Sequence, residues 1–274
     1  MSRRGFTLIE LLIGMVVTAI LGIALARILI SDSRFVGKQD AMINARHASR
    51  AAMNTMVTEL RMVGDGGLLA ATPDSVRVLV PYAFGLTCTV SGADLIASLM
   101  PPDSLMYGSA VTDGLAWRDS VGAYNMITGI TVAGSSNVAA CQADSIRVVP
   151  GGMLVAISGI SGPPPQPGRI FYLYQTVTYR FAASTDIPGR IGLWRKAGSA
   201  AAEELVAPFD SAAGFACLVG PNLQIQTCPP GGGLATARGL ELRMVGASEY
   251  PPPGSATPET FSLITQVPFL NKVN

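Results

Sequence analysis

Few side chains in this sequence could carry acid–base, metal or nucleophilic chemistry. The 274 residues include one histidine, His47, so one chain cannot form a metal site with two or three histidines. A Ser-His-Asp triad would have to use His47, which lies in a polar helical stretch far in sequence from any candidate serine elbow. Neither a phosphate-binding P-loop nor a dinucleotide-binding fingerprint occurs. The Asp and Glu residues are scattered, without the spacing of an acid–base pair or a calcium loop. We therefore expect no enzyme, with no catalytic residue, no metal and no cofactor.

The four cysteines are Cys88, Cys141, Cys217 and Cys228. No two of them form a Cys-x-x-Cys pair, which argues against zinc binding and a redox motif. An even number in an exported chain indicates two disulfides, and four cysteines allow three connectivities. Cys217 and Cys228 are closest along the chain, so we favour that pair, and Cys88–Cys141 by elimination. Four free buried thiols are the alternative.

The carboxylate most in need of explanation is Glu10, because it lies in an apolar run. Arg3 and Arg4 precede the run, and residues 11–26 carry no charge. As a helix, residues 6–30 would span about 37 Å, enough to cross a hydrocarbon core of about 30 Å. Basic residues before such a segment hold the N-terminus in the cytoplasm. A carboxylate inside it costs about 2.5–3.5 kcal/mol on insertion scales, so Glu10 is a functional-site candidate.

The nine residues from Gly5 to Ile13, GFTLIELLI, resemble the class III signal of type IV prepilins and type II secretion pseudopilins. The resemblance implies that a prepilin peptidase cuts between Gly5 and Phe6 and that Phe6 becomes N-methylated. It also implies that Glu10 meets the N-terminal amine of a neighbouring subunit during filament assembly. Two charges that are each costly in lipid become less costly when they pair in the same layer.

Two simpler interpretations of the N-terminus remain open. Ser2–Phe6 also resembles a twin-arginine export signal, and Ala24–Ala26 supplies an Ala-x-Ala cleavage pattern, so that a soluble protein would begin at Arg27. An acidic residue in the export signal and its very short basic region argue against this interpretation. The other alternative is a plain single-pass anchor with no role in assembly.

Helical periodicity continues beyond the apolar run. Small or apolar residues recur in steps of three and four and form one stripe, from which Arg46, Arg50, Glu59 and Arg61 lie apart. The stripe comprises Met42, Ala45, Ser49, Ala52, Met56, Leu60 and Val63. Gly64–Gly67 should end the helix, which gives one helix over 6–63, about 87 Å long. We expect the stripe to pack on the protein's own sheet, and a coiled coil is the alternative.

Beyond Gly67 the sequence alternates as strands do, and proline and glycine runs separate the segments. Strands are expected at 74–80, 144–150, 169–181, 192–196, 223–227, 239–245 and 260–267, the third and fourth forming a hairpin. The order of parts in the last hundred residues resembles PilW-type minor pilins. The matching parts are an aromatic strand with Tyr172, Tyr174 and Tyr179, the Leu-Trp-Arg strand at 193–195, and a terminal pair of strands.

These patterns predict an α+β protein in which a long N-terminal helix, with a membrane half and an amphipathic half, packs on a β-rich pilin-like head. The expected parts are a leader (1–5), a transmembrane and assembly half-helix (6–30), an amphipathic extracytoplasmic half-helix (31–63) and the head (64–274). A head of this size favours a minor pilin, located in a type IV pilus or its priming tip complex. A minor pseudopilin of a type II secretion system and a soluble periplasmic β protein are the alternatives.

The expected partners are other pilin or pseudopilin subunits, the prepilin peptidase/methyltransferase and inner-membrane lipid. The net charge of +1, without clustered basic and aromatic residues, argues against nucleic acid. We expect a single-pass inner-membrane protein, N-terminus in the cytoplasm and head in the periplasm, that then moves to the pilus or cell surface.

Overall fold

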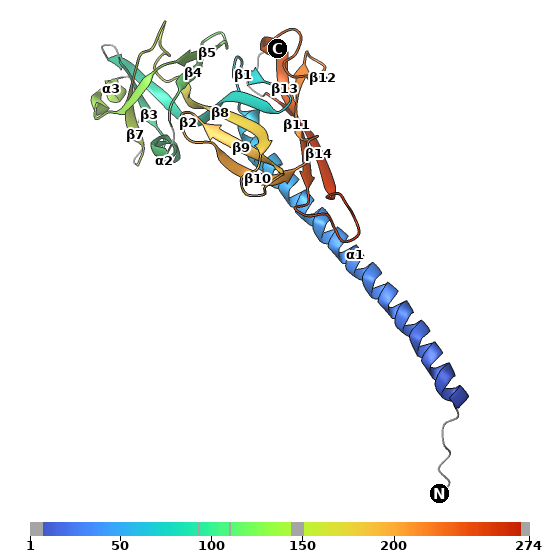
Figure 1. The fold of residues 1–274 in the computed structure, drawn as a ribbon. Coiled ribbons are helices and arrows are strands. Elements are labelled where there is room, and N and C mark those ends of the chain that lie inside the picture. The colour runs from blue at the N-terminus through green and yellow to red at the C-terminus, as the bar shows by residue number, and fades with distance from the viewer. Residues whose placement is uncertain (1–7, 92–93, 110, 144–150, 270–274) are drawn as a thin grey trace.

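The chain forms one long helix that carries a sheet-built head along its C-terminal half (Figure 1). This computed structural model describes residues 8–91, 94–109, 111–143 and 151–269. Helix α1 (Leu8–Arg61) has 54 residues and is therefore about 81 Å long. It ends just before Gly64, as the glycine-rich segment predicted, whereas the expected first residue, Phe6, lies outside the described residues.

In the described residues, the head is one fourteen-stranded antiparallel sheet with two short α-helices and a 3₁₀ turn. Its main path runs in the order β12-β11-β13-β10-β9-β8-β2-β3-β7-β6, and β1, β4, β5 and β14 pair beside that path. The strands are β1 (Leu68–Ala71), β2 (Ser75–Ser91), β3 (Asp94–Leu99), β4 (Gly114–Arg118), β5 (Tyr124–Thr128), β6 (Thr131–Gly134), β7 (Met153–Ser158), β8 (Ile170–Ala183), β9 (Ile191–Ala197), β10 (Glu203–Phe209), β11 (Gly214–Val219), β12 (Gln224–Thr227), β13 (Ala237–Ala247) and β14 (Thr260–Pro268). The short helices are α2 (Pro101–Ser109), α3 (Val138–Ala143) and the 3₁₀ turn η1 (Leu234–Thr236).

The two longest strands join two lobes of the head. β2 and β8 pair from Ser75–Arg180 to Leu86–Ile170. Toward the end of β2, β3–β7 with α2 and α3 build a distal lobe around Leu99, Trp117 and Phe171. Toward its start, β9–β14 build a proximal lobe on the helix, and Figure 1 shows the two lobes side by side.

Several predicted strands are present, and the distal lobe differs from the prediction. The β8–β9 hairpin was predicted, as were the strands at 223–227, 239–245 and 260–267. β2 was predicted to end before Pro81, but it continues to Ser91, because a register shift between Pro81 and Ala83 accommodates the proline. Helices α2 and α3 were not predicted, because they lie between the expected strands at 74–80 and 144–150, where no particular element had been named. The expected strand at 144–150 lies outside the described residues.

Candidate assembly interface on the N-terminal helix

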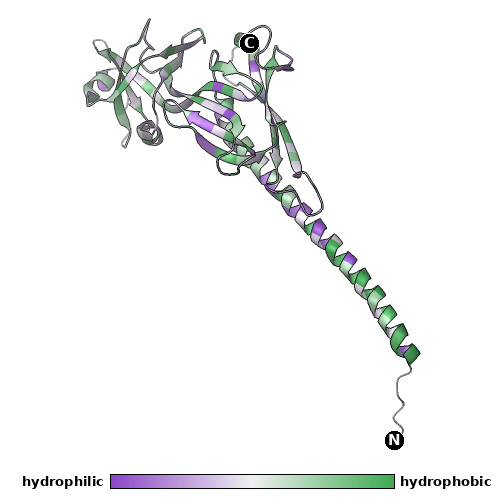
Figure 2. Cartoon of the chain, viewed as in Figure 1, coloured by the Kyte–Doolittle hydropathy of each residue, from purple (hydrophilic) through white to green (hydrophobic). Residues whose placement is uncertain are grey.

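The first half of α1 is an apolar surface that no other described part of the chain covers (Figure 2). Its most apolar eighteen-residue window has a mean hydropathy of 2.5, and none of that window is buried. Leu8, Met15 and Ile20 are 83%, 70% and 61% exposed. Among the described residues, α1 is the one helix long and apolar enough to cross a membrane. This surface needs lipid, other helices or both to remove it from water.

Glu10 lies in the first described turn of α1, where the helix dipole favours a negative charge. Residues 8–30 are exposed, and Glu10 is the one carboxylate among them. Gly5 and Phe6, the expected cleavage and methylation residues, lie outside the described residues, so only Glu10 of the three can be placed.

The second half of α1 packs on the head through the predicted stripe. Ala45, Ala52, Met56 and Leu60 are completely buried against β13, β14 and β10. The stripe therefore packs on the protein's own sheet, as expected. Met42, at the start of the stripe, is only partly buried.

The helix backbone and the sheet come close together at Ser49 and Gly246. The Gly246 N–H donates to the Ser49 hydroxyl over 2.9 Å, and that hydroxyl is 3.0 Å from the Phe261 carbonyl and 3.1 Å from the Ala45 carbonyl. A Cβ atom on Gly246 would overlap the Ala45 carbonyl oxygen. Only a glycine allows the helix backbone to lie directly on the strand here. The sequence showed no sign of this contact, because the two residues are about 200 positions apart.

Glu59 connects the end of the helix to β8 and β9. The Arg195 guanidinium lies 2.9 Å from the Glu59 carboxylate, and the Tyr179 hydroxyl donates to the same carboxylate over 2.5 Å. Burial and then the Glu59 charge raise the pKa of Tyr179, so the phenol stays protonated and donates. Burial alone would lower the pKa of Arg195, but Glu59 and Tyr179 together outweigh burial and raise that pKa. Sequence analysis placed Glu59 off the packing stripe, and the structure shows it partly buried in this network.

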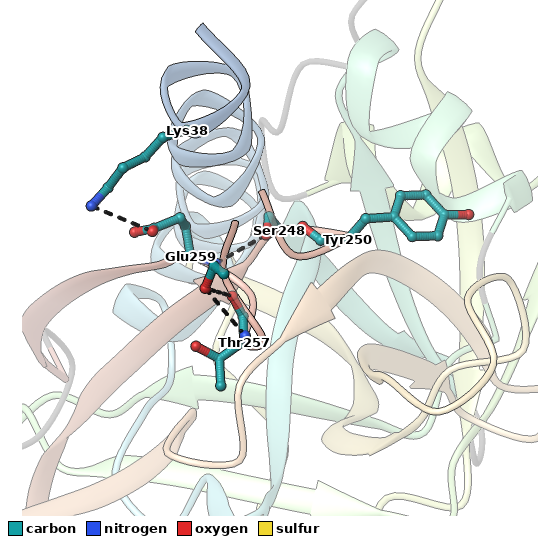
Figure 3. A network of polar contacts seen from close by, with 6 residues as sticks. Lys38, Ser248, Tyr250, Thr257 and Glu259 are labelled. Carbon is teal, nitrogen blue, oxygen red and sulfur yellow. Dashed lines mark hydrogen bonds and ion pairs between the residues drawn. The ribbon is translucent and has the colours of Figure 1, made fainter. Parts of the chain in front are cut away.

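The loop between β13 and β14, residues 248–259, contacts the middle of α1, and Figure 3 shows the polar contacts there. The Lys38 ammonium lies 3.5 Å from the Glu259 carboxylate. The Glu259 N–H donates to the buried Ser248 hydroxyl over 3.0 Å, and that hydroxyl donates to the Tyr250 carbonyl over 2.7 Å. A Cβ atom on Gly37 would lie 2.6 Å from Pro253, so this helical glycine makes room for the loop.

The structure joins Cys88 to Cys141 and Cys217 to Cys228, with Cα atoms 4.5 Å and 5.3 Å apart. These are the two pairs that the sequence favoured. The first connects β2 to α3 in the distal lobe, and the second connects β11 to the loop after β12 in the proximal lobe. Each lobe therefore carries one covalent cross-link.

His47 lies exposed on α1, beside a surface depression of about 400 Å³ that Asn44, Pro208 and Glu249 help to line. Within the described residues, no group of three or more His, Cys, Asp or Glu side chains could hold a metal ion. Glu204 accepts hydrogen bonds from the Thr185 N–H and hydroxyl, each over 2.8 Å. It therefore has a structural role in the β8–β9 turn.

In a comparison with protein families, residues 1–26 match the prokaryotic N-terminal methylation motif. The chain carries a type IV pilin-like signal. Comparison with curated proteins and with solved structures found no significant match. The signal, together with the apolar helix behind it, supports a type IV pilin-like or pseudopilin protein with a single-pass inner-membrane anchor. Such proteins are structural and usually not enzymes, and their motif indicates interaction with other pilin subunits and with the prepilin peptidase.

Proposed function

We propose that this chain is a minor pilin that is cut between Gly5 and Phe6, N-methylated on Phe6 and assembled into a type IV pilus or its priming tip complex. Residues 1–5 are then the leader, 6–30 the membrane and assembly half of the helix, 31–63 the half that supports the head, and 64–274 the head. The N-terminus enters from the cytoplasm and the head stays in the periplasm until assembly. The resemblance of the last hundred residues to PilW-type minor pilins supports this subclass.

The observation that carries the proposal is the exposed apolar half of α1 with one carboxylate near its start. Lipid can cover the apolar side chains before assembly, and the helices of neighbouring subunits can cover them afterwards. The cationic N-terminal amine of a neighbour would offset the cost of holding the Glu10 carboxylate in this apolar layer. Glu10 thereby sets the axial position of one subunit against the next.

The helix also bears on the export-signal alternative. α1 runs unbroken through Ala24–Ala26 into the head. Cleavage there would cut inside a continuous helix and leave Arg27 at the start of a long exposed stalk. This continuity favours retention of the segment in the mature protein.

Mass spectrometry of the mature N-terminus, in membrane and soluble fractions, tests the proposal first. A membrane-bound chain that begins at Phe6 with one added methyl group is the expected result. A soluble chain that begins at Arg27 would overturn the proposal and leave a free periplasmic protein.

Glu10→Ala tests the assembly role, with Thr18→Ala as the matched control because it removes another polar side chain from the same apolar half. We expect the Glu10 variant to be inserted and processed but lost from sheared filaments, and the Thr18 variant to be present in them. Equal amounts of both variants in the filaments would contradict the role of Glu10. If the chain is recovered with surface pili, it is a pilin. If its deletion instead abolishes protein secretion, it is a type II secretion pseudopilin.

A further inference from the structure

The head has one sheet edge that differs from the others in length and chemistry. Five strands pair on one side only in the described part of the chain: β1, β5, β6, β12 and β14. Four of them have only four or five residues, whereas β14 has nine. Short edges are a common protection against unwanted strand pairing, and β14 lacks that protection.

β14 also lacks the other usual forms of protection. Its sequence, TFSLITQVP, contains no charged residue, and its proline stands at the last position. It pairs with β13 from Gly239–Pro268 to Ala247–Thr260 without a register shift, so no bulge turns the edge away. Ile264, in the middle, is 57% exposed.

The register identifies which backbone groups face outward. The Phe269 N–H donates to the Arg238 carbonyl, and the Ser248 N–H donates to the Glu259 carbonyl, in the same register that pairs the two strands. Hydrogen-bonded pairs alternate in an antiparallel ladder, so the odd-numbered residues of β14 bond to β13. The N–H and C=O groups of the even-numbered residues face the outer side. These residues are Thr260, Ser262, Ile264 and Gln266.

The position of β14 determines which molecule can reach this edge. The strand begins beside the middle of α1, where the Arg46 guanidinium lies 5.0 Å from the centre of the Phe261 ring. Its far end reaches Phe269, which lines a depression together with Gly64 at the end of the helix. The edge therefore runs along the half of α1 that carries the head.

We propose that the outer edge of β14 binds an extended strand from the head of a neighbouring subunit and so continues the sheet from one subunit into the next. The inference rests on the proposed function, because assembly through the helix brings that neighbour alongside. Main-chain hydrogen bonds to the four outward residues supply the affinity, and the absence of charge on β14 selects an uncharged partner strand. The contact adds a second connection, between heads, to the one between helices.

A photo-reactive benzophenone amino acid at position 264 of the full chain, in cells that assemble the filament, tests the proposal. Ile225 is the matched control, since it is an isoleucine with 50% exposure on the four-residue edge strand β12. We expect an adduct with a filament subunit from position 264 and none from position 225. Equal adducts from both positions, no subunit adduct from 264, or an adduct only with a protein outside the filament would overturn the proposal.

Ser262→Pro tests whether the contact uses the backbone, because it removes one outward N–H without taking a hydrogen bond from β13. Ser262→Ala keeps that N–H and is its control. Loss of one hydrogen bond should lower the adduct yield about fivefold in the proline variant and leave it unchanged in the alanine variant. An unchanged yield in a Ser262→Pro chain that melts like the parent would overturn strand addition.

Ile264→Lys provides a second variant if the proline disturbs folding, with Ile225→Lys as its control. It places a charge on the edge without altering the backbone, and it should exclude the partner strand. The mature N-terminus is measured in the same cells. If the Ile264→Lys chain is correctly processed and is present in filaments at the parental level, strand addition alone is overturned. A chain that is not cut at Phe6 overturns the proposed function itself.

Discussion

The two halves of α1 share one backbone and differ in what covers their apolar side chains. Met15 is 70% exposed, and Met56 is completely buried under the head. The second half is covered by the protein's own head, because β10, β13 and β14 pack on its apolar stripe. Glu59 has its partners on β8 and β9. The first half has no such complement among the described residues. The packing that stabilises the head and the exposed apolar surface therefore belong to different parts of the same helix.

The largest expected difference in stability is between two methionine substitutions, one in each half of α1. Met56→Ala should lower the free energy of unfolding of the head by about 2–5 kcal/mol, because it removes packing and leaves a cavity. Met15→Ala should change that free energy by less than about 0.5 kcal/mol, because the side chain contacts no part of the head. Denaturant unfolding of the full chain in detergent, followed by the fluorescence of the head, measures both. Similar losses in the two variants would contradict the division between the halves.

The close contact at Gly246 should be nearly as sensitive. Gly246→Ala forces a methyl group against the Ala45 carbonyl and separates the helix from β13, so we expect a loss of about 1–3 kcal/mol. Gly231→Ala is the control, since no atom lies within 4 Å of the added methyl group. The same unfolding experiment compares them. If Gly246→Ala were as stable as its control, the helix would not lie directly on the strand at this position.

A smaller effect concerns the junction between the helix end and the distal lobe. The ring of Tyr124 lies on Gly64, and burial, then the nearby Tyr172, raises the pKa of Tyr124 to about 12, against the opposing charge of Arg118. The ordinary value is 10.0, so the folded state holds the phenolic proton more tightly than the unfolded state. This contribution to stability is complete below pH 10.0 and is lost as the pH rises toward about 12.

Tyr124→Phe should therefore make the free energy of unfolding fall less steeply over that pH range, with only a small change at neutral pH. Unfolding curves at a series of pH values measure the slope. Parallel curves for the parent and the variant would show that the Tyr124 hydroxyl is not buried at this junction.

The parts of the fold that could be predicted have a regular local pattern. The steps of three and four from Ala45 to Leu60 predicted both the helix and its buried face, since a helical period is visible in any short window. The alternation in 169–181 predicted β8 for the same reason. The nine contiguous residues from Gly5 to Ile13, with Glu10 among them, predicted the pilin-like signal, because the whole motif is visible in one short segment.

The rest depends on contacts between residues far apart in the sequence. Gly246 has no unusual neighbours in sequence, and its role follows only from the helix backbone that lies on it. Glu59 lies off the packing stripe in the sequence, and only the fold places Arg195 and Tyr179 beside it. The distal lobe was harder still, because Pro81 interrupts a strand pattern that the bulge in β2 in fact tolerates. The unusual length of the β14 edge requires knowledge of the whole strand order.

The loop over residues 248–259 has a mechanical consequence. It meets α1 at Gly37, only about 10 Å along the axis from Ile30, the last residue of the proposed assembly segment. From there to Glu59, three polar contacts attach the head at successive positions along the helix axis. They are the Lys38–Glu259 pair, the Ser49–Gly246 contact and the Arg195–Glu59 pair. In the described residues, the head is therefore held directly on the helix by several contacts. A rotation of the helix about its own axis therefore turns the head through the same angle, and a pull on the head is transmitted directly along the rod.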